Sequence, residues 1–457
     1  MLTTPARGMR DFLPADVRRR QYVIGVIADV YQRYGFEPLE TPAVENLATL
    51  LGKYGEEGDR LIFKILKRGE GETTGQADLA LRYDLTVPLA RVVAEYRATL
   101  PKFFKRYQVQ PVWRADRPQK GRFREFYQCD VDAIGSRSMT VEAELLGAAA
   151  DVLARLGFSD YALRLNHRGV LAGMLAAGGV PEALHGEALV ALDKLDKIGR
   201  EGVAAELQAR GVPDAGASAL LSFFASVAEA ATGADADAGA YNREVLDRLR
   251  QLMGGHRPDA LAELDAIVGL SASTAAGRHV RLDPSLARGL SYYTGAIFEI
   301  AVPDLAGSLG GGGRYDNLIG MFLGQDVPAC GISLGLERIL VVMGERGMFP
   351  PDVATAPADV MVTIWNLDDV SASLALAAGL RSSGLRVEVY PDADKLGKQF
   401  KYASSRGIPF VTVVGDEEAA AGLVTVKDLA TGQQRRVARA EAAAAIRDGL
   451  AAAGTPA

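Results

Sequence analysis

The sequence predicts an α+β protein with three parts: a core built on an antiparallel sheet, a helical insertion, and a separate C-terminal α/β domain. Two apolar, strand-like runs at residues 108–113 and 123–131 flank a turn at 118–121, which is typical of an antiparallel pair. Residues 170–275 are rich in Ala, Gly and Asp and follow a mostly helical pattern. In residues 359–457 strands and helices alternate, which predicts a small, mainly parallel sheet with helices on its faces.

Composition excludes several classes of protein. The chain has 457 residues, 48% of them hydrophobic, which suits two or three domains with substantial cores. Its two cysteines, Cys129 and Cys330, argue against a disulfide framework, and its four histidines have no ligand-like spacing, so we expect no protein-bound metal. No uncharged apolar run could span a bilayer, and the N-terminus lacks the apolar centre of a signal peptide. We therefore expect a soluble, cytoplasmic protein without membrane contact.

The N-terminal part of the chain predicts a helix, an extended run and a hairpin. Apolar positions recur on one face of residues 14–34, which predicts an amphipathic helix, and residues 36–44 form an extended run with two prolines. Residues 68–76 form a turn between two strands, and the second strand is expected to end at Asp84 and Thr86. An Asp in this position is typical of a helix cap, although an acid there would also suit an ammonium group.

Later elements follow from the same signals. Residues 140–156 predict a helix with Thr140 as its N-cap, residues 158–166 predict a strand, and residues 232–240 are expected to form a loop. In the C-terminal domain we expect strands at 360–365, 386–390 and 410–415, and helices at 370–382 and 395–406.

Two glycine-containing segments suggest a ligand site. The four consecutive glycines Gly310–Gly313 are expected between strands, where backbone without Cβ atoms can approach a ligand. Residues 331–343 predict a strand end, a glycine and a helix that opens with Glu337 and Arg338. The helix macrodipole disfavours an arginine in the first turn, so a bound anion would explain this placement better than a surface ion pair.

A basic stretch interrupts the acidic chain. Between Arg82 and Arg124 lie eleven basic residues and three acidic ones, although the whole chain has 51 basic against 57 acidic residues. Polar side chains alternate along the second predicted strand and should share one face if no bulge intervenes: Arg122, Arg124, Gln128, Asp130 and Asp132. A solvated sheet face is the alternative, but the charge reversal and the interleaved aromatic residues favour an anion-binding site.

The same stretch resembles a known family. The segments RYDLTVP and VWRADRPQKGRFREFYQCDVD resemble motif 2 of the class II aminoacyl-tRNA synthetases and, closely, the histidyl-tRNA synthetase family. The segment RGLSYYTG, which begins at Arg288, resembles a motif found in this family and its paralogues, and GGGGRYD resembles the second family motif. Many relatives have Asp where this chain has Ser291, so we assign no ligand role to that position.

The resemblance covers nearly the whole chain. The N-terminal helix with Pro42 matches motif 1, the dimer interface of the family, and GISLGLERILVVM matches motif 3. The segment ALDKLDKIGREGVAAEL resembles the family's insertion domain, and KLGKQFKYASSRGIPFVTVVGDEE resembles its anticodon-binding domain. The implied domains are a catalytic core at 1–169 and 276–348, a helical insertion at 170–275, a linker at 349–358 and an anticodon-binding domain at 359–457. Lys194, Lys197 and Arg200 of the insertion could touch an acceptor stem, although a solvated helix face fits the interleaved acids better.

The resemblance implies a histidine–tRNA ligase that works as a homodimer. It would activate histidine with ATP and Mg²⁺ and pass the histidyl group to the 3′ end of tRNA(His). Arg114 and Arg288 would be the catalytic pair at the α-phosphate, Arg122 and Arg338 would hold the outer phosphates, and Glu337 would be a further ATP contact. Histidine would be bound by Asp84, Thr86, Gln128, Asp132, Tyr292 and Tyr293. The anticodon would meet Lys395, Lys398 and Lys401.

The alternative function is that of a non-catalytic paralogue acting as a regulatory subunit of histidine biosynthesis. Such paralogues usually lack the C-terminal domain, and the arginines of the motifs are intact in this chain. Both features favour the ligase.

Overall fold

The computed structural model of the chain describes residues 3–192, 194–233, 237–287, 290–350, 353, 356–367 and 370–453. The chain divides into two compact units, Met1–Phe349 and Pro350–Ala457. Each unit has its own sheet and its own apolar core. The boundary lies at the start of the expected linker.

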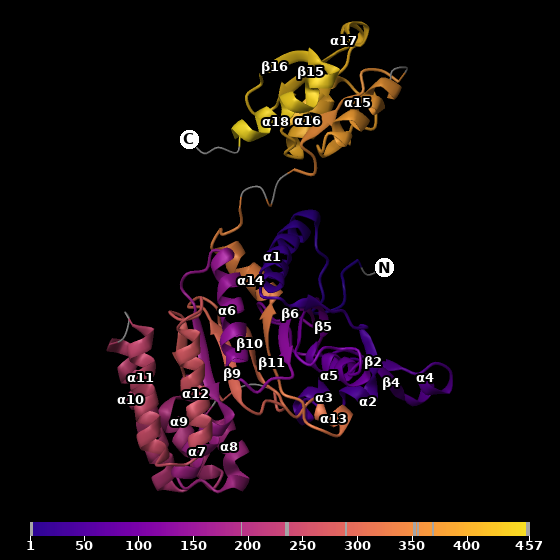
Figure 1. Cartoon of the computed structure of the whole chain (residues 1–457). Helices are drawn as coiled ribbons and strands as arrows, with labels where there is room; N and C mark the ends of the chain where they lie inside the picture. The colour runs from indigo at the N-terminus through magenta and orange to yellow at the C-terminus, as the bar shows by residue number, and fades with distance from the viewer. Residues whose placement is uncertain are drawn as a thin grey trace. The chain divides into compact units, whose positions relative to one another are not determined.

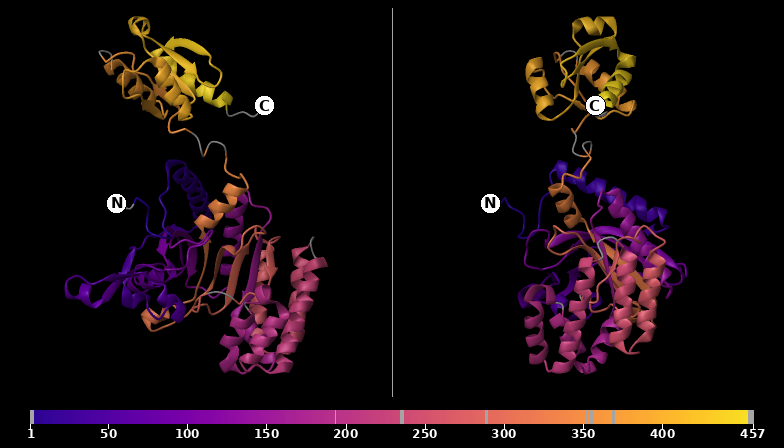
Figure 2. Two further views of the ribbon diagram at one scale, coloured as in Figure 1. Left: turned by 180° about the vertical axis from the view of Figure 1, so that it is seen from behind. Right: turned by 90° about the vertical axis from the view of Figure 1, so that its left-hand side faces the viewer.

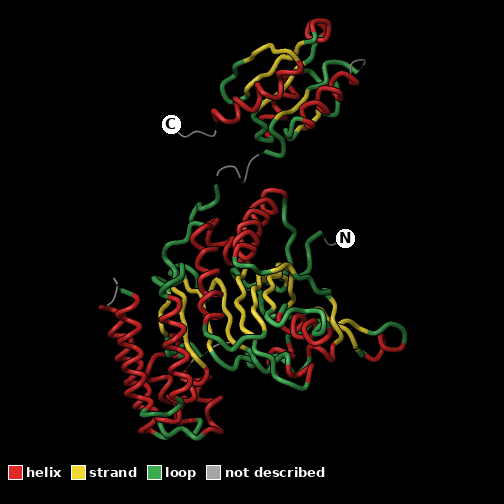
Figure 3. The backbone as a smooth tube through the Cα atoms, in the orientation of Figure 1, coloured by secondary structure: helices red, strands yellow, loops and turns green. Residues whose placement is uncertain are grey.

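The first unit is built on an eight-stranded sheet, which is the antiparallel core that the sequence predicts (Figure 3). Its spatial order is β1-β5-β6-β11-β10-β9-β7-β8, and only the two edge pairs, β1 with β5 and β7 with β8, are parallel. The strands are β1 (Glu37–Pro38), β5 (Phe104–Trp113), β6 (Glu125–Ile134), β7 (Ala162–His167), β8 (Val280–Leu282), β9 (Ala296–Ala301), β10 (Ser308–Arg314) and β11 (Ala329–Gly335).

Three long helices cover one face of this sheet (Figure 1). They are α1 (Pro14–Arg33), α6 (Thr140–Arg155) and α14 (Leu336–Glu345). Cys129 and Val131 of β6 are buried in the same apolar core as Leu145 of α6 and Ile339 of α14. Because side chains alternate along a strand, the even-numbered residues of β6 point to the opposite face. The polar side chains of β6 therefore lie away from the helices, on a face of their own.

A smaller sheet and several short helices lie beside β5. The small sheet has the order β2-β4-β3, and β3, β4 and α4 form an arm that projects from the body (Figure 3). Its elements and the neighbouring helices are β2 (Val44–Asn46), α2 (Leu47–Leu50), α3 (Gly55–Arg60), β3 (Lys64–Leu66), α4 (Glu70–Thr74), β4 (Ala77–Leu81), α5 (Thr86–Glu95) and α13 (Gly320–Leu323).

The helical insertion predicted between residues 170 and 275 is present as a bundle beyond the β8 edge of the sheet (Figure 2). It contains α7 (Arg168–Ala177), η1 (Glu182–Leu184), α8 (His185–Leu192), α9 (Leu195–Ala209), α10 (Asp214–Gly233), α11 (Ala238–Met253) and α12 (Pro258–Ser271). The loop expected at 232–240 is shorter than predicted, because α10 reaches Gly233 and α11 begins at Ala238; residues 234–236 lie outside the described residues.

The second unit is an α/β domain with a five-stranded sheet of order β13-β12-β14-β15-β16. Its elements are β12 (Val360–Val362), α15 (Val370–Ser382), β13 (Val387–Val389), α16 (Leu396–Ser405), β14 (Phe410–Val413), α17 (Asp416–Ala421), β15 (Leu423–Asp428), β16 (Gln434–Ala438), η2 (Arg439–Glu441) and α18 (Ala442–Ala453). The prediction of a mainly parallel sheet was wrong, because β15 and β16 add two antiparallel pairs to the two parallel ones.

Several predicted boundaries also differ from the structure. Strand β4 ends at Leu81, and Thr86 begins helix α5 instead of ending a strand. Thr140 is the first residue of α6, whose N-cap is Met139. The four glycines lie inside β10 and are not a connection between strands.

Candidate active site

A cavity of about 400 Å³ opens on the face of the large sheet that the three long helices leave free. Its floor is formed by the even-numbered side chains of β6 and by the strands next to it. The lining residues are Thr86, Arg114, Asp116, Gly121, Arg122, Phe123, Phe126, Gln128, Asp130, Asp132, Leu290, Tyr292, Tyr293, Glu299, Gly307, Ser308, Leu309, Gly310, Gly311, Tyr315, Gly331, Ile332, Ser333, Gly335, Glu337 and Arg338.

Glycines of β11 leave space beside the side chains of the cavity floor. Gly331 of β11 lies opposite Asp132 of β6 in the ladder, and Gly335 lies opposite Gln128. A Cβ atom on Gly331 would come within 1.9 Å of the Asp132 Oδ1 atom. The Asp132 side chain therefore has room only because the residue opposite it on β11 carries no side chain.

Three of the predicted arginines meet at one end of the cavity. The Nε atom of Arg114 donates to the Tyr83 carbonyl at 3.1 Å, and its guanidinium lies 4.3 Å from the Tyr83 ring centre. Arg122 donates twice to Asp116 Oδ2, at 3.0 and 2.8 Å, and Arg338 donates to the Ser308 carbonyl.

The electrostatics of this end favour an anion. Burial lowers the pKa of the Arg338 guanidinium, and the neighbouring charges of Arg122 and Arg114 lower it further. Three cations that repel one another in a partly enclosed site are stabilised when a polyanion binds among them. The alternation predicted along the second strand fails at Arg124, which lies before β6 and donates to the Asp116 carbonyl instead of lining the cavity.

The other end of the cavity collects the residues predicted to bind an amino acid. Thr86, Gln128, Asp132, Tyr292 and Tyr293 all line it. The Gln128 amide donates to the Ser333 hydroxyl at 2.9 Å, whereas its buried Oε1 atom has no hydrogen-bond partner among the described residues. A buried acceptor without a partner costs free energy, so this oxygen suits a donor carried by a ligand.

Asp84 lies beneath this end and does not line the cavity. Its side chain is fully buried, and it accepts hydrogen bonds from the Tyr54 hydroxyl at 2.9 Å, the Val87 amide at 3.0 Å and the Tyr292 hydroxyl at 3.1 Å. Burial raises the pKa of the Asp84 carboxyl. The bond from Val87 gives the helix-capping contact that was the alternative for this residue, and the bond from Tyr292 fixes a ring of the cavity wall.

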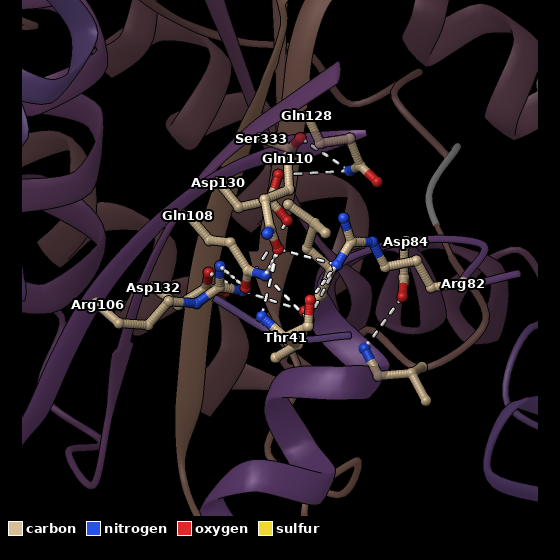
Figure 4. A network of polar contacts seen from close by, with 12 residues as sticks. Thr41, Arg82, Asp84, Arg106, Gln108, Gln110, Gln128, Asp130, Asp132 and Ser333 are labelled. Carbon is tan, nitrogen blue, oxygen red and sulfur yellow. Dashed lines mark hydrogen bonds and ion pairs between the residues drawn. The ribbon is translucent and has the colours of Figure 1, made fainter. Parts of the chain in front are cut away.

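A buried polar network underlies the floor (Figure 4). Arg106 of β5 is fully buried and lies 2.8 Å from Asp132 and 4.0 Å from Asp130. Gln108 accepts from Arg106 at 3.1 Å and donates to the Thr41 hydroxyl at 3.0 Å. One cation thus serves two buried carboxylates. Burial raises the pKa of both carboxyl groups, and Arg106 opposes this shift.

Arg106 and Gln108 were missed by the sequence reasoning as site residues, and Asp130 was placed on the polar face of the second strand without a ligand role of its own. The signal was present, because polar residues alternate with apolar ones along β5 as they do along β6. The pairing of Arg106 with Asp132, and of Gln108 with Asp130, depends on the strand register, which the sequence alone does not give.

Glu337 has a different environment from the one expected of an ATP contact. Its side chain is buried and accepts from Arg20 of α1 at 2.8 Å and from the backbone amide of Tyr127 at 2.9 Å. Both of its oxygens therefore bond to the protein, and the residue joins α1, β6 and α14 at the back of the cavity.

The remaining predicted residues belong to the segment after Ala287, to the insertion or to the second unit. Arg288 falls outside the described residues, although Leu290 and Tyr292 just after it line the cavity. Lys395, Lys398 and Lys401 are exposed at the start of α16 in the second unit. In the insertion, Lys194 is paired with Glu206 and Arg200 is exposed, while the side chain of Lys197 lies outside the described residues.

Within the described part of the chain, neither a membrane-spanning helix nor a cluster of metal-binding side chains is present. No helix there combines the length and apolarity needed to cross a bilayer. No three His, Cys, Asp or Glu side chains in the same residues are grouped to hold a metal ion.

A large antiparallel sheet with a cationic cavity on its open face, followed by a separate α/β domain, is the architecture of the class II aminoacyl-tRNA synthetases. The family model described as "Histidyl-tRNA synthetase" matches residues 8–339, and the model described as "Anticodon binding domain" matches residues 359–449. The chain belongs to the histidyl-tRNA synthetase family.

Individual relatives agree with this assignment. The chain is 41% identical to the Histidine–tRNA ligase of Flavobacterium johnsoniae, over 94% of this chain and 95% of the relative. It is 40% identical to that of Gloeobacter violaceus, over 95% and 96% of the two chains. Among solved structures, histidyl-tRNA synthetase from Nostoc sp. PCC 7120 matches with a TM-score of 0.82 at 30% identity, over 98% of this chain and 99% of that one.

Proposed function

We propose that this chain is a histidine–tRNA ligase that forms histidyl-adenylate from histidine and ATP and transfers the histidyl group to tRNA(His). The observation that carries the proposal is the division of one cavity into two ends: Arg114, Arg122 and Arg338 at one, Gln128 and Asp132 at the other. A nucleoside triphosphate suits the first end. The second end suits an amino acid that carries an ammonium group and a heterocyclic ring with one hydrogen-bond donor and one acceptor.

We infer a role for each residue at this end of the cavity. The carboxylate of histidine attacks the α-phosphorus and displaces pyrophosphate, so negative charge grows on the phosphate oxygens and fixed cations stabilise the transition state. Arg114 and Arg288 act at the α-phosphate, and Arg122 and Arg338 hold the outer phosphates. Glu337 supports the ATP end from behind by fixing α14, since its oxygens already accept from Arg20 and Tyr127.

Histidine recognition uses the other end. Gln128 offers the ammonium an oxygen that has no partner within the described part of the protein. Asp132 and Tyr293 supply the acceptor and the donor that an imidazole requires. Thr86 and Tyr292 complete the wall, and Asp84 acts by holding Tyr292 in place.

Mg²⁺ fits this arrangement as a companion of ATP. It takes oxygen ligands, keeps several waters and binds proteins mainly through one or two carboxylates together with substrate phosphates. Glu299 of the cavity wall is the carboxylate that would help to hold it. The ion would neutralise charge on the phosphates.

Assembly and RNA binding are further parts of the proposal. We propose a cytoplasmic protein that assembles as a homodimer, in which Leu13 and Val17 of the motif 1 region, 70% and 36% exposed in the single chain, would lie at the interface. The domain at 359–457 would bind the anticodon through unstacked bases and through Lys395, Lys398 and Lys401. Light scattering should then give a mass near twice 48.5 kDa, and a fully active monomer would contradict the dimer.

Histidine-dependent exchange of pyrophosphate into ATP tests the function. A ligase exchanges label only when histidine is present, because the adenylate must form and reverse. Other amino acids serve as controls. A regulatory paralogue would bind histidine without exchange, and that result would overturn the proposal.

A further inference from the structure

Three side chains at alternate positions along β7 and into α7 hold one loop of the core. Arg164 bonds to the Asp283 carboxylate. The Asn166 amide donates to the carbonyls of Pro284 at 3.1 Å and Leu286 at 3.0 Å. Arg168 donates to the Ala287 carbonyl at 3.0 Å. The carbonyls of Pro284, Leu286 and Ala287 are thus fixed from β7 and from the first residue of α7.

The loop that they hold leads into the active site. Leu286 and Ala287 are buried in one apolar cluster with Leu171 and Ile297, and Tyr293 packs against that cluster. Residue 288 follows Ala287 directly in the chain, and Leu290 then lines the cavity. The same strand face also reaches the cavity wall, because Arg164 donates to Glu299 at 2.8 Å.

Asn166 is the central residue of this arrangement. Its side chain is 1% exposed, and its amide donates to the carbonyls on either side of Ser285. Buried bonds between an amide and carbonyls are short-range and directional, so they fix the backbone more tightly than apolar packing does. Without Asn166 the loop would keep the bonds at Asp283 and Ala287 but lose those at Pro284 and Leu286.

We propose that Asn166, with Arg168, is a positioning pair that fixes the backbone of residues 284–287, directly before Arg288, whose proposed role is at the α-phosphate. The inference rests on the proposed role of Arg288 and goes beyond it, because it assigns a function in adenylation to two residues that touch neither substrate. The rate of adenylate formation would then depend on contacts made at the start of the insertion, where α7 begins.

A double-mutant cycle on single-turnover adenylate formation tests the pair. Arg288→Ala should lower the rate by roughly 10²–10³-fold, the usual loss for one preorganised donor. Asn166→Ala should lower it by about 10-fold or more, because a small misplacement of a catalytic group is costly. In the Arg288→Ala background, Asn166→Ala should change the rate by less than about 2-fold, since the group that it positions is then absent.

A matched control is available in the same protein. Asn242 of α11 is 2% exposed and also makes two backbone bonds, donating to Val280 at 3.0 Å and accepting from Leu282 at 2.9 Å. Asn242→Ala should lower the melting temperature about as much as Asn166→Ala. Any effect of Asn242→Ala on the rate should be independent of Arg288, so the two fold-changes should multiply in the double variant. Arg168→Met, which removes one bond and keeps the apolar stem, is the milder variant should Asn166→Ala not fold.

The outcomes separate this inference from the function beneath it. A large effect of Arg288→Ala that multiplies with the effects of Asn166→Ala and Arg168→Met would overturn the positioning role and leave the function intact. An unchanged rate in stable Asn166→Ala and Arg168→Met variants would do the same. An unchanged rate in Arg288→Ala would overturn the role of Arg288 and, with it, the inference. Wild-type protein without histidine-dependent exchange would remove the function itself.

Discussion

At the scale of single residues, the cavity floor holds two buried carboxyl groups whose burial lowers the stability of the folded protein when they are ionised. Asp130 and Asp132 are 2% and 3% exposed, and both lie near the guanidinium of Arg106, at 4.0 and 2.8 Å (Figure 4). Burial raises the pKa of the Asp130 carboxyl, the proximity of Asp132 adds to the shift, and Arg106 opposes it. An acid whose pKa is raised in the folded state is destabilising when ionised.

Asp130→Asn should therefore stabilise the folded protein at alkaline pH. The unfolded Asp ionises near its ordinary pKa and the folded one at higher pH, so wild-type stability falls as the pH rises between these two values. At pH 8 the variant should gain up to about 4 kcal/mol, because the pKa of Asp130 is raised from 3.8 to about 7, and the gain should disappear near pH 4. Thermal melts from pH 4 to 8 measure it. The exposed Asp78→Asn is the control, and a variant less stable than wild type at pH 8 would contradict the expectation.

Gln128→Met should weaken histidine binding without unfolding the site. Methionine keeps the volume but removes the Oε1 acceptor, which has no partner within the described residues. The histidine dissociation constant should rise by about 10-fold, the worth of one hydrogen bond to a charged donor. Calorimetric titration measures it. Ser333→Ala removes only the partner of the Gln128 amide and should have a smaller effect; equal effects would argue against the oxygen as the ligand contact.

At the scale of elements, helix α14 serves two sites with adjacent residues. Arg338 turns toward the cavity and donates to Ser308, whereas Glu337 turns to the back and binds Arg20 of α1. The macrodipole disfavours Arg338 at this helix end, but the anion proposed for the cavity would offset that cost. The position of α14 thus depends on its contact with α1 and determines where Arg338, which we propose to bind ATP, lies.

The pair Arg20–Glu337 should stabilise the packing of α1 on α14. Its side chains are 8% and 4% exposed, so Arg20→Met leaves a buried carboxylate with one fewer donor. We expect a loss of about 3 kcal/mol in the free energy of unfolding. The double variant Arg20→Met/Glu337→Gln should lose less than the sum of the two single variants. Denaturant unfolding measures this. The exposed pair Arg60–Glu56 should show almost no coupling, and additive effects at Arg20 and Glu337 would contradict a buried ion pair.

At the scale of the whole molecule, the chain carries two units with independent apolar cores. Residues of the first core, such as Val131 and Leu145, belong to a different cluster from Val360 and Val424 of the second unit. All cavity-lining residues belong to the first unit. Adenylation and anticodon recognition are therefore separable.

Ending the chain after Phe349 should separate the two activities. The truncated protein keeps every proposed contact to ATP and histidine, so pyrophosphate exchange should survive in part. Charging of tRNA(His) should fall much further, because the anticodon domain is gone. Circular dichroism and light scattering check that the fragment is folded and dimeric. Equal loss of both activities in such a fragment would show that the second unit serves the catalytic core directly.

The sequence alone determined the kinds of element, the order of the motifs and the arginines that meet in the cavity. Helix α15 was predicted with its observed bounds, and α1 and α6 within one residue at the C-terminal end, because helical periodicity is a local signal. Arg114, Arg122 and Arg338 were found because their segments are distinctive in charge and in motif. The sequence did not determine how long strands are or where a glycine run lies in a ladder.

Only the tertiary structure decided which buried groups face one another. Asp84 meets Tyr292 across 208 positions of the chain, and Tyr315 donates to Asp132 across 183. Asn166 reaches the loop before Arg288 across 118 and 120 positions. Such pairs depend on strand register and on which face a helix covers, and no local pattern records either. A one-residue change of register would turn every polar side chain of β6 into the apolar core, so the burial of both faces fixes the register and with it the site.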